Sequence, residues 1–140
     1  MECFRLYGAL RNALPSNAGM YSPQLLDHFE HPRNVGEIVD ADARVRLENP
    51  ACGDILELFA NFENGCIREV RFRAKGCVPA IACGSMITEL VAGRTLIEAK
   101  RISRSTVERE IGGVPEASGH AVQLACDALR ALLGKTRIND

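Results

Sequence analysis

The chain has 140 residues, of which 17 are basic and 18 are acidic, and its formal net charge is −1. This is the length of a single domain, and the balanced charge argues against the basic surface that nucleic-acid-binding proteins need. Six cysteines are too few for a disulfide-rich secreted domain, and no run of residues is apolar enough for a secretion signal or a membrane span. We therefore expect a reducing, cytoplasmic setting and no nucleic-acid or membrane partner.

The first 20 residues differ from the rest of the chain. They carry Arg5 and Arg11 with a single acid, followed by a loop-like stretch of Pro, Ser, Asn and Gly. We predict that residues 1–20 form a disordered leader or extension, with an organelle-targeting segment as the less favoured interpretation. The folded domain is expected to span residues 21–134, and residues 135–140 to form a tail.

A short helix and three strands are predicted next. Ser22 and Pro23 suit the N-cap and first position of a helix that runs from Tyr21 to His31 and stops at Pro32. Residues 44–48, 55–62 and 67–74 alternate between apolar and polar side chains, as half-buried strands do. The sequence Glu-Asn-Gly at 63–65 is typical of a hairpin turn between the last two strands.

The hydrophobic period becomes helical after Pro79. One apolar stripe extends to Val91 before Gly93, two short helices follow over 95–102 and 105–111, and a last helix covers about 118–133. Strands followed by helices predict an α+β fold, in which a three-stranded antiparallel sheet carries helices packed on one side.

The cysteines differ in their local setting. Cys83 and Cys126 each lie on the apolar stripe of a predicted helix, where a thiol behaves as a small hydrophobic group, so we expect both in the core. Cys3 lies in the leader. Cys66, beside the hairpin turn, has no ligand-like neighbour in the sequence, and we interpret it as incidental.

Cys52 and Cys77 lie where the backbone is expected to turn. Cys52 precedes Gly53 and Asp54 in a loop between strands, so a carboxylate lies two residues from a thiol. Cys77 precedes a helix whose first residue is expected to be Pro79, and the helix dipole there should lower the pKa of the thiol. His120 begins the final helix, where the dipole disfavours imidazolium and leaves a ring nitrogen free to bind a metal. Spacing alone leaves open whether these groups share one site.

At these residues the sequence resembles the iron–sulfur cluster assembly scaffold family of the IscU/NifU type, from about Tyr21 to Leu133. The matching segments are Tyr21-Ser22, Asp27-His28-Phe29-Glu30-His31-Pro32-Arg33-Asn34-Val35-Gly36, Pro50-Ala51-Cys52-Gly53-Asp54, Gly76-Cys77, Ala80-Ile81-Ala82, Gly112-Gly113-Val114-Pro115-Glu116-Ala117, His120 and Asp127-Ala128-Leu129.

The resemblance implies a function and a ligand set. Cys52 and Cys77 would be cluster-binding thiolates, Asp54 a carboxylate that keeps the cluster labile, and His120 a nitrogen ligand, all on loops at one end of the domain. Such a scaffold would take sulfur from a cysteine desulfurase, bind iron, hold a [2Fe-2S] cluster and pass it to acceptor proteins, without being an enzyme.

One position departs from the family pattern. The residue after His120 is Ala121, where the family normally has a third cysteine, and Cys126 lies about 140° further round the helix. The Leu-Pro-Pro-Val-Lys motif, by which some members bind an Hsp70-type chaperone, is also absent from the sequence.

Three interpretations follow for the site. The first is a scaffold that holds a cluster with Cys52, Asp54, Cys77 and His120, within one chain or across a dimer. The second is a zinc- or iron-binding regulatory module that assembles no cluster, since two thiols, a carboxylate and an imidazole suit tetrahedral zinc. The third is a sulfur-transfer enzyme with Cys77 as nucleophile and His120 as base.

Overall fold

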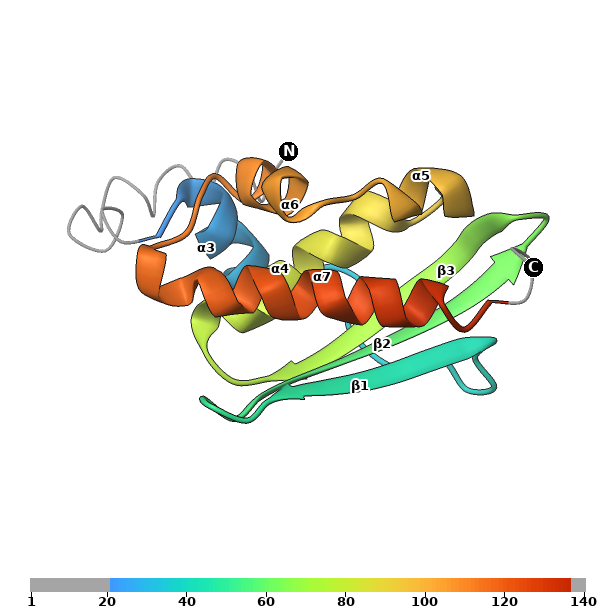
Figure 1. Cartoon of the computed structure of the whole chain (residues 1–140), viewed down its shortest axis with the longest axis horizontal. Helices are drawn as coiled ribbons and strands as arrows, with labels where there is room; N and C mark the ends of the chain where they lie inside the picture. The colour runs from blue at the N-terminus through green and yellow to red at the C-terminus, as the bar shows by residue number, and fades with distance from the viewer. Residues whose placement is uncertain (1–20, 137–140) are drawn as a thin grey trace.

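The computed structural model describes residues 21–136 of the chain. Three antiparallel strands form a sheet in the order β1-β2-β3, and all of the helices lie over one face of it (Figure 1). The predicted α+β fold is therefore confirmed. The predicted leader and residues 137–140 of the predicted tail lie outside the described residues.

The strands follow the predicted alternation of side chains. They are β1 (Ala43–Asn49), β2 (Asp54–Glu63) and β3 (Cys66–Lys75), each one residue longer at both ends than predicted. Val45, Leu58 and Phe72 point to the helices and are at most 8% exposed. A register shift at Asn61/Phe62 places Asn61 opposite Glu69 and Phe62 opposite Ile67, which accounts for the slip in alternation near Glu69.

Helix α3 (Pro23–Glu30) begins as its sequence predicts. Ser22 is the N-cap, and its hydroxyl accepts a hydrogen bond from the Leu25 N–H at 3.0 Å. The same hydroxyl donates to the Ile111 carbonyl, so it ties the start of α3 to the end of a helix about 90 residues later in the chain. The helix packs on α4 (Val78–Val91), which lies between α3 and the sheet.

Helix α4 is the central helix, and the prediction of a single apolar stripe was wrong for it. Ten of its 14 residues are buried, because the sheet, α3 and α7 surround it on most sides. A Cβ atom at Gly84 would lie 2.9 Å from the Phe72 ring, so glycine allows the helix to approach the sheet closely. The helix also starts at Val78 rather than Pro79, and Cys77 is its N-cap.

The remaining helices cover the outer side of α4 and one edge of the sheet. Helices α5 (Leu96–Lys100) and α6 (Arg104–Glu110) each begin with a capping box, from Thr95 and Ser103. A turn of 3-10 helix, η1 (Glu116–Ser118), was not predicted and leads into α7 (Gly119–Leu133). Helix α7 runs along the sheet over β1 and β2 (Figure 1). Across residues 21–136, no helix combines the length and hydropathy that crossing a bilayer requires.

Candidate metal centre

Asp54 lies at the centre of a cluster of metal-binding side chains at one end of the sheet. It is the first residue of β2, it pairs with Asn49 across the tight β1–β2 turn, and it is 2% exposed. Its Oδ2 atom lies 3.2 Å from the Sγ of Cys52, 3.3 Å from the Sγ of Cys77 and 3.4 Å from the Nε2 of His120. The other three predicted site residues therefore converge on one oxygen of Asp54.

Gly76 makes the approach of β3 to Asp54 feasible. It has a φ of +146°, and a Cβ atom at this position would lie 2.7 Å from the Asp54 carboxyl carbon and in hard contact with its Oδ1. The absence of a side chain lets the chain pass directly over the carboxylate. The Cys77 N–H then donates a hydrogen bond to Asp54 Oδ1 at 3.1 Å, which fixes one oxygen and leaves Oδ2 facing the thiols.

The hydrogen bonds around Asp54 favour its ionised form. Burial alone would raise the pKa of this carboxyl, but hydrogen bonds from the Cys52 thiol and from the backbone and thiol of Cys77 hold it below its ordinary value. The site thus contains a buried negative charge that faces two sulfur atoms. Such a charge is stabilised by a cation.

The predicted lowering of the Cys77 pKa was wrong for the protein without metal. Burial of Cys77 raises the pKa of its thiol, and the hydrogen bond to the Asp54 carboxylate raises it further. A hydrogen bond from the backbone N–H of Ala80, in the first turn of α4, lowers the pKa of the thiol as expected, but burial and Asp54 raise it by more. A thiolate at Cys77 therefore depends on a bound cation to offset the charge of Asp54.

His120 directs its Nε2 atom toward the other three groups. Its Nδ1 lies 3.1 Å from the Ala117 carbonyl oxygen, and since a carbonyl can only accept, Nδ1 carries the hydrogen. Nε2, the other ring nitrogen, faces Asp54 Oδ2 at 3.4 Å and lies 4.0 Å from the Cys77 Sγ. The backbone contact at Nδ1 thus orients the ring so that Nε2 is the atom placed to bind a metal ion.

The spacing of the donor atoms suits coordination. Ligand atoms of Cys52, Asp54 and His120 all lie within 4.8 Å of one another. The Sγ of Cys77 lies 3.3 Å from Asp54 Oδ2 and 4.0 Å from His120 Nε2. Ligands about 2.0–2.3 Å from a tetrahedral ion lie roughly 3.3–3.8 Å apart, close to the separations around Asp54. Sulfur, nitrogen and carboxylate oxygen together suit zinc or iron.

The other cysteines in the described residues do not join this cluster. Cys83 and Cys126 are 0% and 5% exposed within the helix layer, which confirms the prediction that they are core residues. Burial raises the pKa of Cys83 to about 12, so its thiol stays protonated. Cys66 is half-buried at the start of β3. Ala121, one residue after His120, is 1% exposed and offers no ligand.

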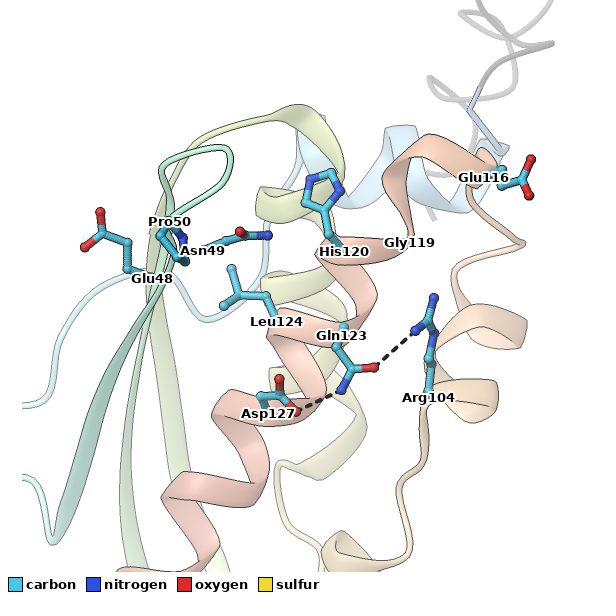
Figure 2. Close-up of a pocket in the computed structure, with 10 residues that line it drawn as sticks. All are labelled: Glu48, Asn49, Pro50, Arg104, Glu116, Gly119, His120, Gln123, Leu124 and Asp127. Carbon is cyan, nitrogen blue, oxygen red and sulfur yellow. Dashed lines mark hydrogen bonds between the residues drawn. The ribbon is translucent and has the colours of Figure 1, made fainter.

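A polar groove of about 560 Å³ opens beside His120, and sequence reasoning missed it (Figure 2). Its lining residues come from the end of β1, the β1–β2 turn, α6, η1 and α7: Glu48, Asn49, Pro50, Arg104, Glu116, Gly119, His120, Gln123, Leu124 and Asp127. Arg104 donates to Gln123, which donates to Asp127 at 2.8 Å. The four-residue spacing of Gln123 and Asp127 places both on one face of a helix, but nothing in the sequence indicates that Arg104 lies opposite them.

Sequence comparisons relate the chain to proteins of iron–sulfur cluster assembly. The family model for the NifU-like N-terminal domain matches residues 20–137. Over 111 residues the chain is 43% identical to the iron-sulfur cluster assembly scaffold protein IscU 1 of Archaeoglobus fulgidus, covering 79% of this chain and 72% of that protein. Over 115 residues it is 38% identical to the scaffold protein IscU of Aquifex aeolicus, covering 81% and 73%.

Solved structures share the fold. A NifU-like N-terminal protein from Brucella abortus superposes with a TM-score of 0.71 at 15% identity, covering 84% of this chain and 94% of that one. A protein proposed as a scaffold for the SUF system of Fervidobacterium islandicum gives a TM-score of 0.69 at 19% identity, covering 83% and 98%. At these identities the similarity establishes the arrangement of strands and helices.

Proposed function

The chain belongs to the NifU-like N-terminal domain family, and we propose that it is an iron–sulfur cluster assembly scaffold. It binds iron and sulfide as a labile cluster and passes that cluster to acceptor proteins. The cluster is cargo rather than a resident cofactor, and the chain turns over no small molecule. The resemblance to curated scaffold proteins over about four-fifths of the chain supports this function.

We propose Cys52, Asp54, Cys77 and His120 as the ligands. The single observation that carries this assignment is the convergence of two thiols and an imidazole on the Asp54 Oδ2 atom within 3.4 Å. Two thiolates, one carboxylate and one imidazole match the four terminal ligand positions of a [2Fe-2S] cluster. A carboxylate and an imidazole bind iron less tightly than thiolates do, so this set favours release.

The exposure of the site suits transfer between proteins. Cys52 is exposed on the β1–β2 turn, whereas Asp54 beneath it is buried, so a bound cluster would have one open side. We infer that a cysteine desulfurase delivers sulfur from this side and that acceptor proteins take the cluster from it. The abundance of unpaired thiols is in keeping with a cytoplasmic location.

The test is the content of iron, zinc and acid-labile sulfide in protein purified without oxygen and reconstituted with iron and sulfide. We expect iron and sulfide in about equal amounts and visible absorption from sulfur-to-iron charge transfer. One zinc per chain that reconstitution fails to displace, with no sulfide, would contradict the scaffold function and favour a zinc-binding module.

Variants test the ligand assignment. Cys52→Ala and Cys77→Ala should each abolish the visible absorption, because each removes a thiolate from the set around Asp54. Cys83→Ala is the matched control on α4, where loss of a buried thiol should lower stability by roughly 1 kcal/mol and leave the cluster in place. If Cys83→Ala removes the cluster and Cys77→Ala does not, the assignment is wrong.

A further inference from the structure

The face of the sheet that the helices leave uncovered carries a concentration of positive charge. The strand register places nine residues on this face in three rows across the strands: Arg44, Phe59 and Arg71; Arg46, Glu57 and Arg73; Glu48, Ile55 and Lys75. Five of these residues are cations and two are acids, whereas the whole chain has a net charge of −1. We call these nine residues the basic sheet face.

Two of the arginines are held in place by an aromatic ring. Phe59 points away from the helices, yet it is only 1% exposed, and Arg44 and Arg73 lie over its ring at 5.3 and 5.7 Å from the centroid. Cation–π contact of this kind keeps the guanidinium planes ordered while their edges remain free to donate hydrogen bonds. Arg73 is fixed further by ion pairs with Glu57 and Glu37.

Three of the five cations on this face have charge left to offer, whereas Arg71 is paired with Glu69 at 3.0 Å. Within residues 21–136, Arg44 and Lys75 have no carboxylate within ion-pair distance, and Arg46 reaches Glu48 only at 3.9 Å. A shallow pocket of about 200 Å³ lies between Arg46, Arg73 and Lys75, with Ile55 and Glu57 in its lining. The face therefore combines fixed and uncompensated positive groups.

The pocket adjoins the candidate metal centre. Ile55 follows Asp54 directly in β2, and Lys75 is two residues before Cys77. The row that contains Glu48, Ile55 and Lys75 is next to the Asn49–Asp54 pair that begins the site. A protein that rests on the basic sheet face would thus reach over the same end of the sheet on which Cys52 is exposed.

We propose that the basic sheet face is the docking surface for a partner protein that presents several neighbouring carboxylates. This partner exchanges the iron–sulfur cluster at the adjacent metal centre. This inference rests on the proposed function. The positive groups lie on β1 and β3, roughly 10 Å apart across the sheet and over roughly 13 Å along the strands, an area that suits a protein surface better than one small anion. A second copy of the chain is disfavoured, since a two-fold contact would bring this face against its own like charge.

The test measures binding to an acidic apo-ferredoxin of the [2Fe-2S] type, titrated calorimetrically against the metal-free protein at about 20 mM and about 200 mM salt. We expect Arg46→Glu combined with Lys75→Glu to raise the Kd about tenfold or more at low salt and to flatten its salt dependence. Lys100→Glu combined with Arg101→Glu makes the same charge change on and beside α5, on the helix side, and should alter the Kd less than about twofold.

Because binding is measured on the metal-free protein, the result does not depend on whether the protein assembles a cluster. Equal weakening by both pairs of variants would show that net charge alone matters and would overturn the proposal. Competition by inorganic phosphate at concentrations close to the ferredoxin Kd would identify the pocket as a small-anion site instead. Dimerisation in sedimentation runs that the Arg46/Lys75 pair abolishes would assign the face to a second copy of the chain.

Discussion

At the scale of single residues, Gly76 sets how closely β3 can approach the Asp54 carboxylate. Gly76→Ala would place a Cβ in contact with that carboxylate at a backbone φ of +146°, so either the strand or the ligand must move. We expect the unfolding free energy to fall by about 1–3 kcal/mol in urea titrations and iron loading to fall with it. Gly65→Ala is the control, because Gly65 also has a positive φ but has open space where the Cβ would lie.

Iron loading identifies the cause of the difference between these two variants. The backbone cost of alanine is about 1 kcal/mol at Gly65, with a φ of +76°, and is larger at Gly76, with a φ of +146°, so the extra loss of stability in Gly76→Ala combines backbone strain with the contact. A loss of iron loading in Gly76→Ala alone reports the contact with Asp54. Equal losses, with normal iron loading in both variants, would contradict the role given to Gly76.

Ala121 is the residue at which we expect the ligand set to depart from the pattern of the family. It is 1% exposed in the first turn of α7, directly after His120. Ala121→Cys would add a third thiol beside the proposed ligands, and soft thiolates hold iron more firmly than carboxylate or imidazole. We expect the reconstituted variant to lose its visible absorption several-fold more slowly in the presence of a chelator. Unchanged decay would mean that the added thiol stays in the helix layer.

At the scale of elements, a buried polar network joins α3 to α4. His28 is 4% exposed; its Nδ1 lies 2.7 Å from the Ser85 hydroxyl, and its Nε2 lies 3.2 Å from Glu89. The Ser85 hydroxyl also accepts the Arg33 N–H at 2.9 Å, so its own hydrogen is free for His28 Nδ1. These contacts satisfy a neutral imidazole at the centre of the helix pair.

The network predicts that acid destabilises the contact between α3 and α4. Burial lowers the pKa of His28 below 6.5, and nearby Arg33 lowers it further against the opposing effects of Glu89 and Asp27. The unfolded chain then binds more protons below about pH 6.5, so the unfolding free energy should fall as pH drops from about 7.5 to 5.5. One group contributes at most about 1.4 kcal/mol per pH unit.

His28→Gln provides the matching measurement by urea titration across this pH range. Glutamine keeps a polar side chain at the position but does not titrate, and His31 and His120 remain. The slope of stability with pH should be flatter in the variant than in the parent protein. An identical slope in both would assign the effect to other groups.

The elements themselves were predictable to different degrees. Alternation in β1, β2 and β3 follows from one buried and one open face, and the open face proved to be the one that carries arginines. Helix α4 was misread because only its overall hydrophobicity, and no stripe, signals burial on most sides. The pKa of Cys77 was misjudged because a helix terminus can be found in the sequence, whereas the burial and the carboxylate that oppose it depend on tertiary structure.

At the scale of the whole molecule, the site joins parts of the chain that are far apart in sequence. The β1–β2 turn, the β3–α4 junction and the start of α7 meet at one end of the sheet, over a span of 69 positions from Cys52 to His120 counted inclusively. The spacing of these residues in the sequence could not predict that the three segments lie together, because no local hydrophobic period links them. The resemblance to a known family did predict that these four residues lie together, and their role as ligands stays a prediction. The groove and the basic sheet face follow from the folded arrangement.

This arrangement predicts that metal binding stabilises the entire domain. Zinc, a redox-inert test ion, would connect the sheet to α4 and α7, and a ligand at about 100 times its Kd adds about 2.7 kcal/mol to the folded state. We expect the Tm of the metal-free protein to rise by several degrees on zinc addition and to return on chelation. Cys77→Ala combined with His120→Ala should show little rise, since it leaves only Cys52 and Asp54. A rise of equal size in that variant would place the zinc elsewhere, for example at the acidic residues of the groove beside His120.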